Sequence, residues 1–94
     1  MKQVSLKRAM EILGYTEIKA NNGFNYQSAF GKDKDGNIWY ANTGDWRWRS
    51  PNGTYIRRAD SYTDYVGKTN EFWFDRKLAE KGYQLKPKFS KKSG

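Results

Sequence analysis

The sequence contains no cysteine and no histidine. Without cysteine it can form no disulfide, no thiolate nucleophile and no zinc–thiolate site. Without histidine it lacks the side chain that most often serves as an acid–base catalyst near neutral pH and as a metal ligand. Small domains outside the cell usually carry disulfides, so the lack of cysteine favours a reducing compartment.

Long apolar runs are also missing, and only 36% of the residues are hydrophobic. No segment approaches the roughly 20 apolar residues of a membrane-spanning helix. The N-terminal segment MKQVSLKRAMEIL carries charges throughout and lacks the apolar region of a signal peptide. We therefore expect a cytoplasmic protein that does not associate with membranes.

What the sequence does have is an excess of aromatic rings and of positive charge. Four Trp, seven Tyr and five Phe make up 17% of the 94 residues, and each ring can bury about 150–250 Å². The rings can therefore build one small core, predicted as a single domain over 1–85. Lys and Arg number 18 against 10 Asp and Glu, a net charge of +8, which is typical of nucleic-acid-binding domains.

The first segment has the signals of a short helix. Ser5 is a suitable N-cap, and Leu6, Met10 and Leu13 follow at the spacing of one helix face. Gly14 stands where glycine commonly ends a helix. The narrow apolar stripe predicts a helix that packs on a neighbouring element.

A second helix is predicted over about 70–81. Thr69 or Asn70 is its expected N-cap, Glu71 lies in its first turn, and Gly82 follows its last residue. Its apolar stripe consists of Phe74 and Leu78.

The C-terminal segment divides into two parts. Residues 83–85 can return as a short strand. Residues 86–94, KPKFSKKSG, carry four Lys and no acid, which predicts a basic flexible tail.

Between the two helices the sequence alternates with a period of two. Strands are predicted at 24–30, 38–41, 46–50 and 54–58, separated by the turns DKDGN, NTGD and SPNG. Residues 15–23 are a connector that can hold a brief strand. The expected fold is α+β, with a four-stranded antiparallel meander over about 24–58 between the two helices.

Turn geometry gives an expected register for this meander. Three-residue loops ending in Gly44 and Gly53 place apolar side chains on one face of the sheet and arginines on the other. A register shifted by one residue would move every side chain of a strand to the opposite face. The expected cross-strand pairs are Tyr40–Trp46, Ile38–Trp48, Trp48–Ile56 and Arg47–Arg57. The expected inner face is Phe30, Ile38, Tyr40, Trp46, Trp48 and Ile56. The expected outer face is Trp39, Arg47, Arg49, Tyr55 and Arg57.

Residues 31–42 resemble part of a calcium-binding loop. Asp33, Asp35 and Gly36 match its third, fifth and sixth positions, but Gly31 and Asn42 stand where its two end ligands belong. Losing both end ligands removes the charge that binds Ca²⁺. The segment is therefore interpreted as a turn.

One group of acidic residues in the sequence is a candidate for catalysis, namely Asp60, Asp64, Glu71 and Asp75. Such carboxylates can hold Mg²⁺ in a nuclease, but more often they balance nearby cations or cap helices. No glycine-rich phosphate loop follows a strand. We expect neither enzymatic activity nor a cofactor.

The strongest functional signal is the segment 46–58, WRWRSPNGTYIRR, with four Arg and no acid. Arginine binds phosphate through its planar fork and also stacks on rings, so its interleaving with Trp and Tyr suits a surface that contacts phosphates and stacks on bases. The same alternation is, however, normal for any half-exposed strand. The predicted binding residues are Trp39, Arg47, Arg49, Tyr55, Arg57, Arg58, Lys88, Lys91 and Lys92.

Two functions fit these residues. The first is binding to nucleic acid, DNA or RNA, through the arginine and aromatic face of the sheet. The second is a protein-interaction module, an inhibitor or adaptor of the kind found in phages and mobile elements, whose partner has an acidic surface. Trp, Tyr and Arg are the residues enriched at interface hot spots, so the sequence leaves both open.

Overall fold

The computed structural model describes residues 1–22, 26–44 and 53–86. Its elements in chain order are β1 (Lys2–Val4), α1 (Leu6–Ile12), β2 (Thr16–Asn22), β3 (Gln27–Lys32), β4 (Ile38–Asn42), β5 (Tyr55–Ala59), α2 (Phe74–Glu80) and β6 (Tyr83–Leu85). The predicted α+β class, with two helices and a four-stranded antiparallel sheet, is confirmed. In the described ranges, no helix is long and apolar enough to cross a membrane.

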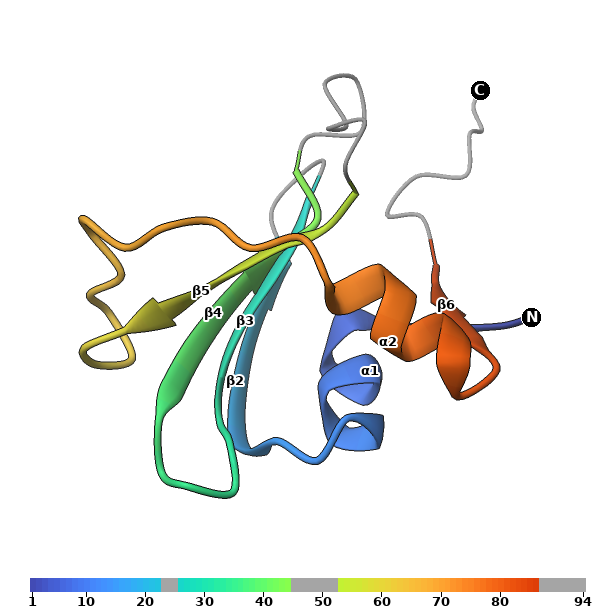
Figure 1. Cartoon of the computed structure of the whole chain (residues 1–94), viewed down its shortest axis with the longest axis horizontal. Coiled ribbons are helices and arrows are strands. Elements are labelled where there is room, and N and C mark those ends of the chain that lie inside the picture. Colours follow the sequence, from blue (N-terminus) through green and yellow to red (C-terminus); the bar gives the residue numbers. More distant parts are fainter. Residues whose placement is uncertain (23–25, 45–52, 87–94) are drawn as a thin grey trace.

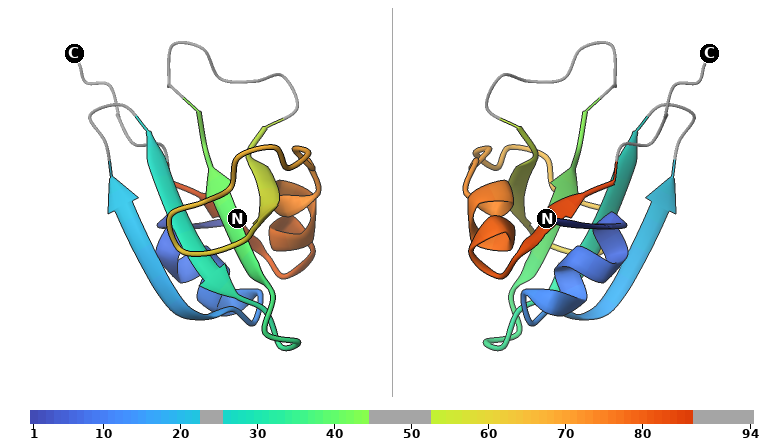
Figure 2. Two further views of the ribbon diagram at one scale, coloured as in Figure 1. Left: turned by 90° about the vertical axis from the view of Figure 1, so that its left-hand side faces the viewer. Right: turned by 90° about the vertical axis from the view of Figure 1, so that its right-hand side faces the viewer.

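The molecule is built around the sheet of β2, β3, β4 and β5, which pair antiparallel in sequence order. Both helices lie on one side of this sheet, as Figure 1 shows, and the segment 60–69 crosses its other side (Figure 2). The short strands β1 and β6 pair in parallel on the helix side. The sheet therefore has two covered faces of different construction.

Helix α1 forms as its sequence predicts. The Ser5 hydroxyl oxygen accepts a hydrogen bond from the Arg8 backbone N–H at 3.1 Å, which caps the first turn. Leu6 and Met10 are fully buried. The chain leaves the helix through Gly14, whose φ of +96° is a left-handed conformation that favours glycine.

The hydrophobic core lies between the helices and the sheet, on what we call the helix face. Its buried members are Leu6, Ala9, Met10, Tyr15, Ala29, Ala41, Ile56, Phe74 and Leu78. Close approach of α1 to β3 requires a small residue, because a Cβ placed on Gly31 would lie 3.1 Å from the Met10 methyl carbon. The strands contribute mainly small residues here, and the helices supply the larger side chains.

Helix α2 begins at Phe74, later than the predicted start near residue 70. The backbone N–H groups of Ile56 and Glu71 each donate to the other residue's carbonyl, at 2.8 and 2.7 Å. This bridge holds Glu71 extended along β5, so the helix can start only after it. The buried stripe of Phe74 and Leu78 and the left-handed Gly82 (φ +91°) are confirmed.

The strand order also corrects the predicted register. β4 pairs with β3 on one edge and directly with β5 on the other, so the predicted pairs Tyr40–Trp46 and Ile38–Trp48 are wrong. Trp48–Ile56 is also wrong, because Ile56 pairs with Ala41 and Glu71. Arg47, of the predicted pair Arg47–Arg57, lies outside the described residues. Residues 46–50, the predicted third strand, lie outside the described residues. The fourth strand of the sheet is β2, in the segment interpreted as a connector. The predicted strand at 83–85 is confirmed, as β6.

The predicted assignment of faces is correct only in part. Phe30 and Tyr40 lie opposite each other and share a face, as expected. Ile56 does not share it, because Ile56 pairs with Ala41 and points into the helix-face core. The rings of Phe30 and Tyr40 therefore lie on the side of the sheet away from the helices.

Candidate nucleic-acid interface

The side of the sheet away from the helices carries a cluster of aromatic rings. We call it the tyrosine face and define it by Phe30, Tyr40, Tyr55, Tyr62 and Tyr65, together with the cations Lys19 and Arg57. Tyr40 and Tyr65 stack face to face, with ring centroids 4.0 Å apart and planes 4° from parallel. The Phe30 ring lies 4.8 Å from Tyr40 and 6.0 Å from Tyr62. The rings form one continuous layer.

Two of these rings come from the segment 60–69, which local contacts fold over the sheet. The Asp60 backbone N–H donates to the Asp64 carbonyl at 2.8 Å. The Asp60 carboxylate forms an ion pair with Lys68 at 3.0 Å. The Asp64 carboxylate accepts the Val66 backbone N–H at 3.2 Å. These contacts fold the segment so that Tyr62 and Tyr65 lie against Phe30 and Tyr40.

The cations of this face lie against its rings. The guanidinium carbon of Arg57 is 5.3 Å from the ring centroids of both Tyr55 and Tyr65. Its Nε donates to the Asn70 side-chain oxygen at 2.8 Å. The Lys19 ammonium lies 5.0 Å from the Tyr62 ring centroid. Arg57 is thus held in place by two rings and a hydrogen bond.

The strand positions that share this face carry more cations than carboxylates. The register places there Lys19, Asn21, Ser28, Phe30, Lys32, Ile38, Tyr40, Asn42, Tyr55, Arg57 and Ala59. The nearest acid along the strands is Glu17, beside the bulge of β2, whose carboxylate lies 3.5 Å from the Lys32 ammonium. The surface that the strands provide is positively charged.

Burial keeps the hydroxyls of Tyr40, Tyr55 and Tyr62 protonated at neutral pH, because it raises the pKa of each. Burial raises the pKa of Tyr40 to about 12, although the Asn42 side-chain amide donates to its hydroxyl oxygen at 2.8 Å. Burial also raises the pKa of Tyr55 and of Tyr62. A neutral hydroxyl can both donate and accept a hydrogen bond, so these groups can contact polar atoms of a ligand.

Of the residues predicted from the sequence, Tyr55 and Arg57 lie on the tyrosine face, whereas Trp39 and Arg58 lie on the opposite side. The expectation that Trp39 shares the face of Arg57 is wrong, because Trp39 pairs with Arg58 and Tyr40 pairs with Arg57. Arg58 lies over the Trp39 ring at 5.5 Å. The predicted residues Arg47, Arg49, Lys88, Lys91 and Lys92 lie outside the described residues.

Trp39 has a structural role in the turn that resembles a calcium loop. Its indole N–H donates to one Asp33 carboxylate oxygen at 2.9 Å. The other oxygen accepts the backbone N–H groups of Asp35 and Asn37, both at 2.9 Å. The Trp39 hydrogen bond and the backbone hydrogen bonds lower the pKa of Asp33. Asp33 closes the turn, as the turn interpretation expects.

Sequence reasoning missed Lys19, Phe30, Tyr40, Tyr62 and Tyr65 as members of the candidate interface. A signal for two of them is present in the segment 60–68, where Tyr62 and Tyr65 stand among polar residues with few aliphatic neighbours. Their position over the sheet depends on the fold of this segment. The alternation of the strands alone does not contain that information.

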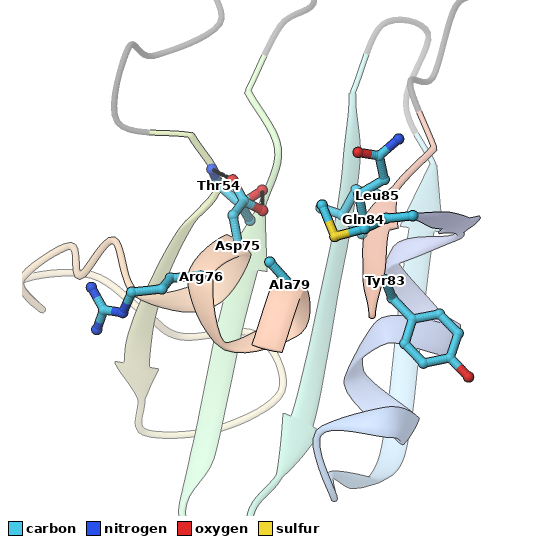
Figure 3. Close-up of a pocket in the computed structure, with 8 residues that line it drawn as sticks. Thr54, Asp75, Arg76, Ala79, Tyr83, Gln84 and Leu85 are labelled. Carbon is cyan, nitrogen blue, oxygen red and sulfur yellow. Dashed lines mark hydrogen bonds between the residues drawn. The ribbon is translucent and has the colours of Figure 1, made fainter. Parts of the chain in front are cut away.

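The acidic residues considered for catalysis do not converge. The Asp75 carboxylate accepts hydrogen bonds from the Thr54 backbone N–H and hydroxyl, both at 2.8 Å, beside a hollow of about 420 Å³ (Figure 3). Glu71 accepts the Trp73 indole N–H at 2.7 Å. Within the part of the chain that the structure describes, no three acidic residues lie close enough together to hold a metal ion.

A scan against protein-family models, a search of curated proteins and a search of solved structures each found no match. The basis for assigning a function is therefore the arrangement of the residues described above.

Proposed function

We propose that this chain is a small, non-enzymatic nucleic-acid-binding protein of the cytoplasm and that the tyrosine face is its binding surface. The observation that carries the proposal is the pairing of Arg57 and Lys19 with tyrosine rings on a strand face where cations outnumber carboxylates. Cations contact phosphates, while neighbouring rings stack on bases. The net charge of +8 favours the same partner.

Arg57 is the central phosphate contact in this proposal. Its guanidinium is already held between Tyr55 and Tyr65, so binding costs it little side-chain entropy. Its planar fork suits a phosphate group. Arg47, Arg49 and the lysines at 88, 91 and 92 remain candidates for additional phosphate contacts, as the sequence predicts.

The test compares two adjacent arginines that β5 directs to opposite sides of the sheet. Fluorescence anisotropy measures the affinity for labelled DNA and RNA, each single- and double-stranded, between about 50 and 200 mM salt. If several phosphates are contacted, the affinity falls by about tenfold or more over this range. Arg57→Gln is expected to weaken binding and to reduce the salt slope by about 1. Arg58→Gln is the matched control, because Arg58 lies over Trp39 on the helix side. Salt-independent binding, or equal effects of the two variants, contradicts the proposal.

A second candidate is the protein-interaction module of the phage or mobile-element type. The observation that favours it is Val66, an apolar side chain in the segment that covers the tyrosine face, which is 77% exposed. The tyrosines and Arg57 beside it are of residue types that are enriched at interface hot spots. Stoichiometric capture of one protein with an acidic surface, after nuclease treatment and lost in Arg57→Gln, would favour this candidate over nucleic acid.

A further inference from the structure

The tyrosine face contains a hollow between the strands and the segment that crosses them. Its volume is about 350 Å³, which is within the range of about 300–1,000 Å³ found for ligand sites. It is lined by Lys19, Asn21, Tyr26, Ser28, Phe30, Tyr40, Tyr62, Thr63 and Tyr65. Five of these nine residues are aromatic, three are uncharged polar residues and one is a cation.

The polar groups of the hollow have hydrogen-bonding capacity to spare. The Tyr62 hydroxyl is buried, and no group in the described part of the chain forms a hydrogen bond with it. A buried hydroxyl without a partner is costly, so a site that contains one gains from a ligand that supplies the partner. The Ser28 hydroxyl donates to the Asn21 carbonyl at 3.0 Å and can still accept a hydrogen bond through its oxygen.

The rings of the hollow come from two layers. Phe30 and Tyr40 belong to the sheet, whereas Tyr62 and Tyr65 belong to the segment 60–69. The centroid of the Phe30 ring lies 6.0 Å from that of Tyr62 and 5.9 Å from that of Tyr65. These rings are in contact with one another, so a flat ring in the hollow packs beside them and meets aromatic neighbours from both layers. A ligand with a planar ring and polar edges fits this lining.

We infer that the hollow receives one unstacked base of a single-stranded nucleic acid, an inference that rests on the proposed function. In a duplex every base is stacked and paired, and entry into such a hollow requires that it first leave the stack. Polar groups of Asn21, Ser28, Tyr62 and Thr63 are available to the edge of the base. The Lys19 ammonium, beside the Tyr62 ring, lies near the phosphate of the same nucleotide.

The experiment uses the full chain and three DNA probes of about 16 nucleotides, a length that covers the usual single-strand site sizes. They are a mixed-sequence single strand, its perfect duplex, and a strand of the same length with abasic sites in place of bases. The intact strand is expected to bind at least about tenfold more tightly than the other two, because stacking contributes strongly for each base. RNA of the same sequence is expected to show the same preference for the single strand.

A variant tests whether the preference arises in this hollow. Tyr62→Phe removes one oxygen and keeps the ring, so the variant keeps its fold. We expect it to bind the intact strand about fivefold more weakly and the abasic strand with unchanged affinity. Tyr83→Phe, in β6 on the helix side, is the matched control and is expected to change neither. An unchanged affinity of Tyr62→Phe for the intact strand overturns the assignment of this hollow.

The outcomes separate this inference from the proposed function. Equal, salt-dependent binding of the intact and abasic strands overturns base insertion while supporting phosphate binding by the tyrosine face. Tighter binding of the duplex than of the single strand has the same consequence. If none of the probes, including RNA, binds in a salt-dependent manner, both the proposed function and the inference are overturned.

Discussion

The two faces of the central sheet are made from alternate residues of the same strands, yet their chemistry differs. The helix face buries small strand residues, Ala29 and Ala41, against Leu6, Met10 and Phe74. The tyrosine face instead packs rings that carry hydroxyl groups, with Lys19 and Arg57 lying against them. Each face is covered by another part of the chain.

This difference separates two tasks. Aliphatic burial stabilises a fold in proportion to the area removed from water, and it needs no polar partner. Tyrosines and cations keep polar atoms that require partners, which makes such a surface less suited to a core and better suited to a ligand. We therefore expect changes on the helix face to reduce stability, and changes on the tyrosine face to reduce binding.

The largest expected effect comes from the helix face. Phe74→Ala removes a side chain that is 0% exposed and is expected to lower the free energy of unfolding by about 3–5 kcal/mol, because it leaves a cavity. Urea denaturation followed by circular dichroism measures this change. Phe72→Ala is the control, since Phe72 is 40% exposed, and similar losses for both variants would contradict the position of the core.

A smaller loss is expected at Gln27, a buried amide that ties parts of the helix face together. Gln27 accepts the Leu6 backbone N–H at 3.1 Å and donates to the Lys86 carbonyl at 2.8 Å. Gln27→Ala leaves both groups without this partner and is expected to cost about 2 kcal/mol. The exposed Gln84→Ala serves as control in the same denaturation series. A cost no greater than that of Gln84→Ala would show that this amide does not join the two ends of the chain.

On the tyrosine face, alkaline pH is expected to have a more modest effect on stability. Burial raises the pKa of Tyr40 to about 12, above the value of about 10 in an unfolded chain. Its contribution is therefore complete below pH 10 and is lost as the pH rises toward 12, by about 1 kcal/mol at pH 11. Urea denaturation of Tyr40→Phe should show a decline from pH 9 to pH 11 that is smaller by this amount. Parallel declines in the two proteins would contradict the burial of Tyr40.

The smallest expected effect on stability is that of Lys19→Glu, a change at an exposed site, which we expect to stay within about 0.5 kcal/mol. The same variant is expected to weaken nucleic-acid binding, because it replaces a cation of the tyrosine face with an acid. Lys7→Glu, on the exposed side of α1, makes the same change of charge on the opposite side of the sheet. Denaturation and anisotropy on both variants separate stability from binding. Equal losses of affinity would show that only net charge matters.

The sequence predicted those elements whose signals are local. The cap at Ser5, the stripe of Leu6 and Met10, and Gly14 were sufficient for α1. The strands near 38–41 and 54–58 followed from alternation and turn residues. Strand β2 lacks this alternation, since it is an edge strand with a bulge and exposed polar side chains, and so its segment was interpreted as a connector.

The errors arose where distant residues decide the structure. The start of α2 depends on the bridge between Glu71 and Ile56, which no helix signal reveals. The predicted inner face is wrong in part because it assigns the largest rings to the core, whereas α1 approaches the sheet over Gly31 and small neighbours. The candidate interface contains Tyr55 and Arg57 as predicted, but its remaining members depend on the fold of the segment 60–69.

The most direct test of the tyrosine face as the binding surface is a nuclear magnetic resonance titration of the ¹⁵N-labelled protein with a short single-stranded oligonucleotide. We expect the amide signals of Lys19, Phe30, Tyr40, Thr63 and Tyr65 to shift or broaden, while those of α1 and α2 stay in place. Shifts confined to α1, α2 and β6, with the tyrosine face unchanged, would contradict this expectation.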